Sequence, residues 1–267
     1  MATNGGDEMT LYDAIGKTYA QTRRSDPRIA AKLLEILAPY HASTIVDIGA
    51  GTGSYAFALA ENGYRILAVE PSATMRSQAA SHPSIQWINA CGEKLPLPAQ
   101  KADVAIIMLA FHHFHNYQKV LQEIHRVTGG GPVVMFTYDP KMISSFWLTQ
   151  YFPSFITDVQ STFLPIATLT SKIELIINAV VNIIPFPLPN DLSDSFAAVG
   201  WSRPELYLEE SIRNGISTFS KLTDDELEQG LSSLYQDLEI GVWDHKYGHL
   251  RQQKQYDVGY RFLYTTA

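Results

Sequence analysis

Residues 46–53 of the 267-residue chain read VDIGAGTG, and this stretch is the strongest indication of its fold. The apolar residues 44–46 lead into it, and a run typical of a helix, residues 55–60 (YAFALA), follows it. Three glycines at alternate positions form a tight turn without Cβ atoms, so a ligand can approach the backbone and the positive end of the next helix. The stretch therefore predicts a strand, a ligand-binding turn and a helix.

A second apolar run, residues 66–69, ends at an acid, Glu70. In a parallel sheet this carboxylate would lie at the tip of the neighbouring strand, where it can accept hydrogen bonds from a ribose. Together with the glycine turn, Glu70 indicates a cofactor that carries a nucleoside. Both a dinucleotide and another nucleoside cofactor fit these two features.

Strands and helices alternate through the first half of the chain. Continuously apolar strands are expected near 44–48, 65–70, 103–108 and 132–138. Amphipathic helices are expected at 28–38, 54–62, 72–80 and 116–127. This alternation is typical of an α/β fold with a parallel sheet covered on both faces, which binds its ligands beyond the carboxyl ends of the strands.

The alternation stops after residue 140. Residues 141–190 are rich in aromatic side chains, and we expect an inserted helical cap, with Trp147 in the wall of a pocket. The core sheet is expected to resume over 191–267, with strands near 204–209 and 257–265 and a helical insertion near 210–253. Residues 1–140 would then form the cofactor-binding core.

The spacing of the glycines is G-x-G-x-G, which differs from the dinucleotide pattern G-x-G-x-x-G. Further motifs follow in order: EPSATM at 70–75, CGEKLPLP at 91–98, DVAIIM at 103–108 and EIHRVTGGG at 123–131. Taken together, these motifs resemble those of the class I S-adenosylmethionine-dependent methyltransferases, in the small-molecule branch that includes the ubiquinone/menaquinone-biosynthesis type. The resemblance implies a Rossmann-like, seven-stranded, mostly parallel sheet with helices on both faces, and S-adenosyl-L-methionine as the cofactor.

The resemblance also assigns residues to the cofactor. Glu70, followed by Pro71, would hold both ribose hydroxyls, since a carboxylate offers two oxygens to two adjacent donors. Asp47 would either reach toward the methionine end or only order the turn. The remaining residues that we expect at the cofactor are Gly49, Gly51, Cys91, Gly92 and Leu109.

Two expectations concern the ends of the cofactor. Many relatives have an aspartate where this chain has Cys91, so the adenine would depend on the Gly92 amide and on apolar walls. The stretch that contains Tyr19 and Arg23 resembles the N-terminal lid helix of many relatives, in which a tyrosine and an arginine close over the methionine moiety. An arginine suits the carboxylate of that moiety. Alternatively, Arg23 pairs with Asp26 or another surface acid.

The sequence FHHFH at 111–115 follows the strand expected at 103–108, where the sulfonium methyl should point. His112 and His113 are the candidate catalytic bases, because an unperturbed histidine titrates near neutral pH. Tyr138 and Asp139 are alternatives for this role. The histidines could also serve only as structural hydrogen-bonding groups, and the spacing does not favour a metal site.

Composition limits the class of protein. A net charge of −7 without a basic patch disfavours nucleic-acid partners, and a single cysteine fits a reducing cytoplasm. The apolar stretch 173–188 is too short for a membrane span and is interrupted by prolines, so a packed helix is expected there instead of membrane insertion. The N-terminus is unlike a signal peptide.

The expected function is methyl transfer to an oxygen, nitrogen or carbon of a small, largely apolar metabolite. A nicotinamide-dependent oxidoreductase and a non-catalytic S-adenosylmethionine-binding protein are the alternatives. The sequence names neither the acceptor nor the oligomeric state.

Overall fold

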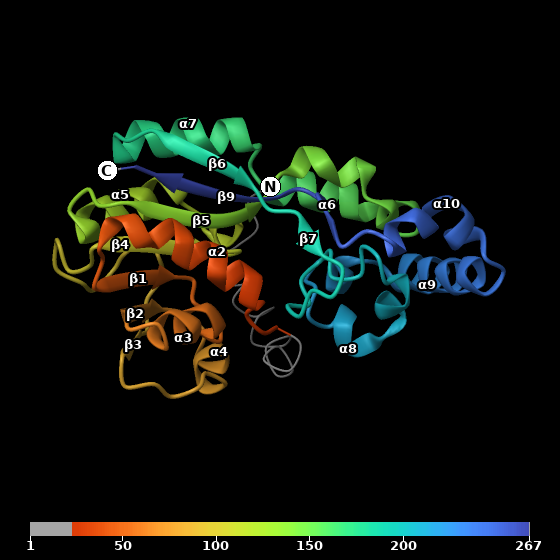
Figure 1. Cartoon of the computed structure of the whole chain (residues 1–267), viewed down its shortest axis with the longest axis horizontal. Helices are drawn as coiled ribbons and strands as arrows, with labels where there is room; N and C mark the ends of the chain where they lie inside the picture. The colour runs from red at the N-terminus through yellow and green to blue at the C-terminus, as the bar shows by residue number, and fades with distance from the viewer. Residues whose placement is uncertain (1–22, 267) are drawn as a thin grey trace.

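The computed structural model describes residues 23–266, in which one sheet organises the fold (Figure 1). Seven strands of this described part lie in the order β3-β2-β1-β4-β5-β9-β6. Their bounds are Thr44–Ile48 (β1), Arg65–Val69 (β2), Ile85–Ile88 (β3), Val104–Met108 (β4), Val133–Tyr138 (β5), Val181–Pro185 (β6) and Tyr260–Thr265 (β9). Neighbouring strands are parallel from β3 to β5, whereas β9 runs antiparallel to both β5 and β6.

Alternate residues of the central strands enter the cores on opposite faces of the sheet. In β1, Ile45 packs into one core and Val46 into the other, and Val104 and Ala105 divide in the same way in β4. Side chains alternate because successive residues of a strand point to opposite faces. Both faces are therefore buried, as the continuously apolar strands predicted.

Helices cover both faces of the sheet. On one face α2 (Pro27–Leu37) packs against α3 (Ser54–Ala60). On the other face α5 (Tyr117–Thr128) packs against α7 (Ile166–Ile177), and Figure 1 shows this pair across the sheet from α2 and α3. The short α4 (Ala73–Ser77) follows β2. The helices and strands expected in the first half are thus confirmed. The structure adds β3, a short edge strand in which only Ile88 is buried and which the sequence did not lead us to expect.

A second group of helices lies beside the carboxyl end of β5, on the right of Figure 1. It contains η3 (Pro140–Ser145), η4 (Trp147–Gln150), α6 (Ser154–Thr162), α8 (Glu210–Arg213), η6 (Phe219–Lys221), α9 (Asp224–Glu239) and α10 (Val242–Arg251). Thr223 caps α9 by accepting a hydrogen bond from the Glu226 amide at 3.2 Å. We call this group the helical lobe.

Two expectations for the second half were wrong. The strand expected near 204–209 is a 3₁₀ helix, η5 (Pro204–Leu208), since Pro204 fixes a helical φ and has no N–H for a strand partner. β6 forms an edge strand of the sheet instead, although it lies within residues 141–190, which we expected to be a helical cap. The helix expected over 173–188 ends at Asn178, which is left-handed at φ 58°, and the β-branched residues after it form the edge strand.

A small two-stranded sheet connects the main sheet to the helical lobe. It pairs β7 (Leu188–Pro189) with β8 (Gln255–Tyr256) in antiparallel orientation. Between β7 and η5, residues 190–203 form turns and bends. Residue Tyr19, which we expected in a lid helix, lies outside the described residues.

Candidate active site

The turn after β1 requires its glycines. Gly49 and Gly53 both have φ of 76°, a left-handed conformation that other residues rarely adopt. A Cβ on Gly49 would lie 2.5 Å from the Ala110 Cβ, and one on Gly53 would lie 2.7 Å from the Trp87 ring. The Gly49 amide donates to the Val69 carbonyl at 2.9 Å, which ties the turn to the end of β2. The turn is therefore rigid and open to a ligand on its outer side, where a Cβ on Gly51 would meet nothing within 4 Å.

Glu70 lies at the tip of β2, where the sequence placed it. Its carboxylate accepts hydrogen bonds from the Gly51 amide and the Ser72 amide, each at 2.9 Å. These two bonds hold both oxygens in place, and each oxygen keeps a lone pair for a further donor. Burial raises the pKa of Glu70, and the two backbone bonds oppose this effect.

Asp47 is the second acid beside the turn, and it is 2% exposed. Its Oδ1 is enclosed and has no hydrogen-bond partner among residues 23–266. Burial and the nearby Glu70 raise the pKa of Asp47 to about 7. An enclosed carboxylate oxygen without a donor among the described residues is a costly arrangement, and a positively charged ligand group would relieve the cost.

These residues line a cavity of about 330 Å³ at the carboxyl ends of β1, β2 and β4, which we call the strand-end pocket. It also includes Pro71, Gly92, Leu109 and, on its exposed rim, Cys91. A Cβ on Gly92 would lie 2.9 Å from the Ile48 side chain, so the chain approaches β1 closely at this point. The pocket thus brings together the described residues that the sequence assigned to the cofactor.

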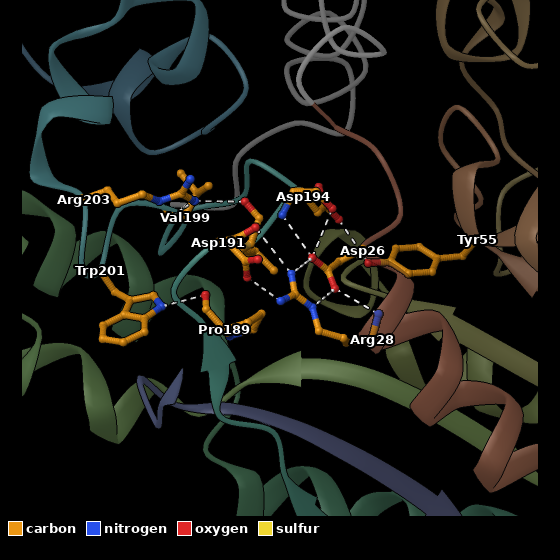
Figure 2. A network of polar contacts seen from close by, with 11 residues as sticks. Asp26, Arg28, Tyr55, Pro189, Asp191, Asp194, Val199, Trp201 and Arg203 are labelled. Atoms are coloured by element: carbon orange, nitrogen blue, oxygen red, sulfur yellow. Dashed lines mark hydrogen bonds and ion pairs between the residues drawn. The ribbon is translucent and has the colours of Figure 1, made fainter. Parts of the chain in front are cut away.

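Arg23 lines the same pocket, but its partner is a residue that the sequence did not indicate. Its Nε donates to the Asp194 Oδ1 at 2.5 Å, and Asp194 is a buried acid, 1% exposed, which differs from the Asp26 or surface acid of the alternative. Tyr55, from α3, donates to the Asp194 Oδ2 at 3.1 Å and points toward it in Figure 2. Asp194 follows the glycine turn by more than 140 residues, and no motif of its own marks it.

The loop that carries Asp194 is held against the start of α2 (Figure 2). Asp26 caps α2 and accepts hydrogen bonds from the Ser193 amide and hydroxyl, both at 3.0 Å. Arg28 bridges Asp26 and Asp191. Burial by itself would raise the pKa of Asp26, but hydrogen bonds from Arg28 and Ser193 lower it to about 2, so this carboxylate stays ionised.

A second cavity, of about 110 Å³, adjoins the strand-end pocket, and we call it the aromatic pocket. Its aromatic lining comes from the sheet, the helical lobe and the connecting segments, namely His112, Tyr138, Phe146, Phe155, Phe163, Phe196 and Tyr260. Arg23, Leu109 and His113 line both pockets. Leu109, directly after β4, has a positive φ of 52°, a strained conformation for a leucine at the point where the pockets meet.

His112 and His113 form part of the aromatic pocket, in the short helix η2 (Phe111–His113). The two rings lie 3.8 Å apart between centroids, and His112 also packs on Phe163 at 4.2 Å. Burial, followed by the nearby His113 and the cations Lys221 and Arg23, lowers the pKa of His112 well below its ordinary range. Burial and the same cations lower that of His113 to about 3. The expectation of a histidine titrating near neutral pH is therefore wrong: both rings are neutral and weakly basic.

Two other residues do not occupy the places we expected. Trp147 is core: its Nε1 donates to the Trp201 carbonyl at 2.8 Å, and its ring packs on Trp243. The cap segment instead contributes Phe146, Phe155 and Phe163 to the aromatic pocket. Asp139, an alternative base, caps η3 through the Lys141 amide and is absent from the described lining of both pockets.

Residues 23–266 show neither of two features that would indicate another kind of partner. Within this range, no group of three or more His, Cys, Asp or Glu side chains has an arrangement that could hold a metal ion. Over the same residues, no helix combines the length and apolar character that crossing a membrane requires.

The comparison with protein families matches residues 46–136 to a family model described as a methyltransferase domain. Among curated proteins, malonyl-acyl-carrier-protein O-methyltransferase of Hamiltonella defensa is 29% identical over 129 residues, 48% of this chain and 50% of that protein. The ubiquinone/menaquinone biosynthesis C-methyltransferase of Rubrivivax gelatinosus is 32% identical over 102 residues, 38% of this chain and 41% of that protein. The chain therefore spans about half the length, or less, of these curated relatives.

Similarity to solved structures extends further along the chain. A candidate methyltransferase from an antibiotic biosynthesis pathway in Anabaena variabilis is 43% identical with a TM-score of 0.88, and the match covers 92% of this chain and 100% of that one. Phosphoethanolamine N-methyltransferase 2 of Haemonchus contortus, in complex with S-adenosyl-L-methionine, has a TM-score of 0.52 at 14% identity and covers 88% of this chain and 52% of that one. The second similarity shows a shared fold.

Proposed function

The chain belongs to the class I S-adenosylmethionine-dependent methyltransferases, and we propose that it methylates an oxygen, nitrogen or carbon atom of a small, largely apolar metabolite. The observation that carries this proposal is the contact between the two pockets. The strand-end pocket has the charges and the glycine turn that suit the cofactor, and the aromatic pocket opens beside it through Arg23, Leu109 and His113. Methyl donor and acceptor can therefore meet at this junction.

The proposed roles at the cofactor follow from the hydrogen-bonding capacity of each group. Glu70, with both oxygens fixed by backbone amides, would accept the two ribose hydroxyls. The Oδ1 of Asp47, which has no partner among residues 23–266, would accept from the α-ammonium group, and the Arg23 guanidinium, which lines the same pocket, would face the carboxylate. Gly92 and the rim at Cys91 would surround the adenine.

S-adenosylmethionine supplies a methyl group that its sulfonium has already activated. The protein's task is then mainly alignment, with reacting atoms at about 3–3.5 Å and water excluded. The buried aromatic walls suit this task, since Phe155 and Phe146 are 1% and 5% exposed. The neutral His112 and His113 are weak bases, so we propose that they orient the acceptor and do not remove a proton before methyl transfer.

We propose that the helical lobe selects the acceptor. Phe155 and Val159 from α6 reach the aromatic pocket from one side, and Ile216 and Thr218, just before η6, reach it from another. A small-molecule site is typically apolar with few polar anchors, which matches this lining. The proposed partners are therefore small molecules and not nucleic acids, which a net charge of −7 would repel, and the proposed location is the cytoplasm, which suits a chain with one cysteine.

The function is tested in two steps. Calorimetry with S-adenosylmethionine against NADH tests the cofactor, and we expect binding of the first alone. Incubation with fractionated metabolite extracts then tests turnover, through formation of S-adenosylhomocysteine. Cofactor binding without product in any fraction would favour a non-catalytic S-adenosylmethionine-binding protein.

A further inference from the structure

Two polar atoms of the aromatic pocket are enclosed and have no hydrogen-bond partner among residues 23–266. They are the Nδ1 of His112 and the phenolic oxygen of Tyr138. Both side chains line the aromatic pocket, and Tyr138 is 6% exposed. Because buried polar groups are nearly always paired in folded proteins, such an arrangement calls for a ligand that supplies the partners.

The two groups approach the pocket from different elements and flank one ring. His112 comes from η2, beyond β4, and Tyr138 is the last residue of β5. The Phe163 ring lies 4.2 Å from the His112 ring and 5.8 Å from the Tyr138 ring, between centroids. A flat ligand packed on Phe163 would therefore have both polar atoms near its edge.

The charged side chains in the lining of this pocket are already paired. Lys221 donates to the Asp158 Oδ1 at 2.7 Å, and Thr218 donates to the other oxygen of Asp158 at 2.7 Å. Arg23 is bound to Asp194. These ion pairs balance the charges of the lining, so the aromatic pocket favours a neutral ligand over a charged one.

Building on the proposed function, we propose that His112 and Tyr138 together bind a hydroxyl group of the methyl acceptor. The acceptor would be a neutral hydroxylated aromatic compound or a conjugated enol. The Tyr138 hydroxyl donates a hydrogen bond to the acceptor oxygen, and His112 Nδ1 accepts a hydrogen bond from the acceptor hydroxyl, with no transfer of the proton. Burial raises the pKa of Tyr138 and lowers that of His112, so both remain neutral and the donor and acceptor roles persist.

A stability measurement separates this role from a structural one. In the ligand-free protein, Tyr138→Phe removes an unsatisfied hydroxyl, so the melting temperature should stay within about 2 °C or rise. Tyr207→Phe is the matched control. The Tyr207 hydroxyl is also buried, but it donates to the Ala197 carbonyl at 2.8 Å and lies outside the described pocket lining. We expect this control to lower the melting temperature.

Ligand binding tests the proposal directly, with 2-naphthol, naphthalene and 2-naphthoate as probes in the presence of S-adenosylhomocysteine. Wild-type protein should bind 2-naphthol more tightly than the other two. Tyr138→Phe and His112→Phe should each weaken 2-naphthol binding by about tenfold and leave naphthalene binding unchanged. In the double variant the losses should be less than additive, because both groups bind one hydroxyl.

Three results would overturn the proposal: no preference for 2-naphthol over naphthalene, tighter binding of 2-naphthoate, or equal 2-naphthol affinity in wild type and Tyr138→Phe. S-adenosylmethionine affinity is measured on the same samples and should be unchanged in both single variants. If wild-type protein itself fails to bind S-adenosylmethionine, the proposed function is refuted, which is a different outcome from failure of the hydroxyl assignment alone.

Discussion

Asp47→Asn should stabilise the ligand-free protein while weakening its binding of the cofactor. Asp47 is 2% exposed, its Oδ1 lacks a partner among the described residues, and burial with the nearby Glu70 raises its pKa from 3.8 to about 7. A folded-state pKa above the unfolded value means that ionisation favours unfolding. The stability of the wild-type protein therefore falls as the pH rises from the lower value to the higher.

The magnitude follows from this difference in pKa. At 1.36 kcal/mol for each pKa unit, the rise from 3.8 to about 7 corresponds to about 4 kcal/mol at a pH above the folded-state pKa. Asparagine keeps the shape but cannot ionise. We expect a gain of about 2–4 kcal/mol at pH 8, since the asparagine amide is also partly unsatisfied, or roughly 5–10 °C in melting temperature. At pH 4.5, where folded wild-type Asp47 is protonated, the gain should shrink to about 1 kcal/mol or less.

The assay is chemical denaturation and thermal melting of both proteins at the two pH values, with calorimetric titration of S-adenosylmethionine at pH 8. Asp103→Asn is the control, and we expect it to change the stability in the opposite direction. Hydrogen bonds from the Thr44 and Ser43 amides lower the pKa of Asp103, so its replacement should destabilise the protein at pH 8. A melting temperature of Asp47→Asn equal to or below that of wild type at pH 8 would refute the electrostatic reasoning. Unchanged cofactor affinity would refute the ammonium contact.

Three further predictions concern single residues. Glu70→Ala should weaken S-adenosylmethionine binding on the order of a hundredfold, since two charge-assisted hydrogen bonds are lost, and titration showing a loss below about threefold would contradict the ribose assignment. Cys91→Asp should leave that affinity unchanged or raise it, because the exposed rim gains an acceptor for the adenine amino group, and much weaker binding by a folded variant would contradict this placement of the adenine. Trp147→Ala should cost about 3–5 kcal/mol of stability by denaturation, because the residue is 4% exposed and packs among aromatic rings. Its folded fraction should bind the cofactor normally, and an unchanged melting temperature would show that Trp147 is not core.

The cofactor half of the protein could be predicted from the sequence. The order of β1, glycine turn and α3, and the acid at the tip of β2, depend on interactions between residues close along the chain. Gly49 must be glycine because of its own φ, and Glu70 reaches its partners Gly51 and Ser72 from the end of an adjacent strand. Such constraints act through local backbone geometry, so they leave a pattern that can be recognised in the sequence.

The acceptor half could not be predicted in this way, because it depends on how distant segments pack in the fold. The pairing of Arg23 with Asp194 joins residues separated by 171 positions, and β6 enters the sheet from a range whose sequence also suits a helix. Trp147 and Phe146 are adjacent in sequence, yet the first is core and the second lines the pocket. Burial also moved the pKa of His113 far from the value its type suggests. Desolvation and long-range packing depend on which distant segments meet, and no local pattern of residues encodes that information.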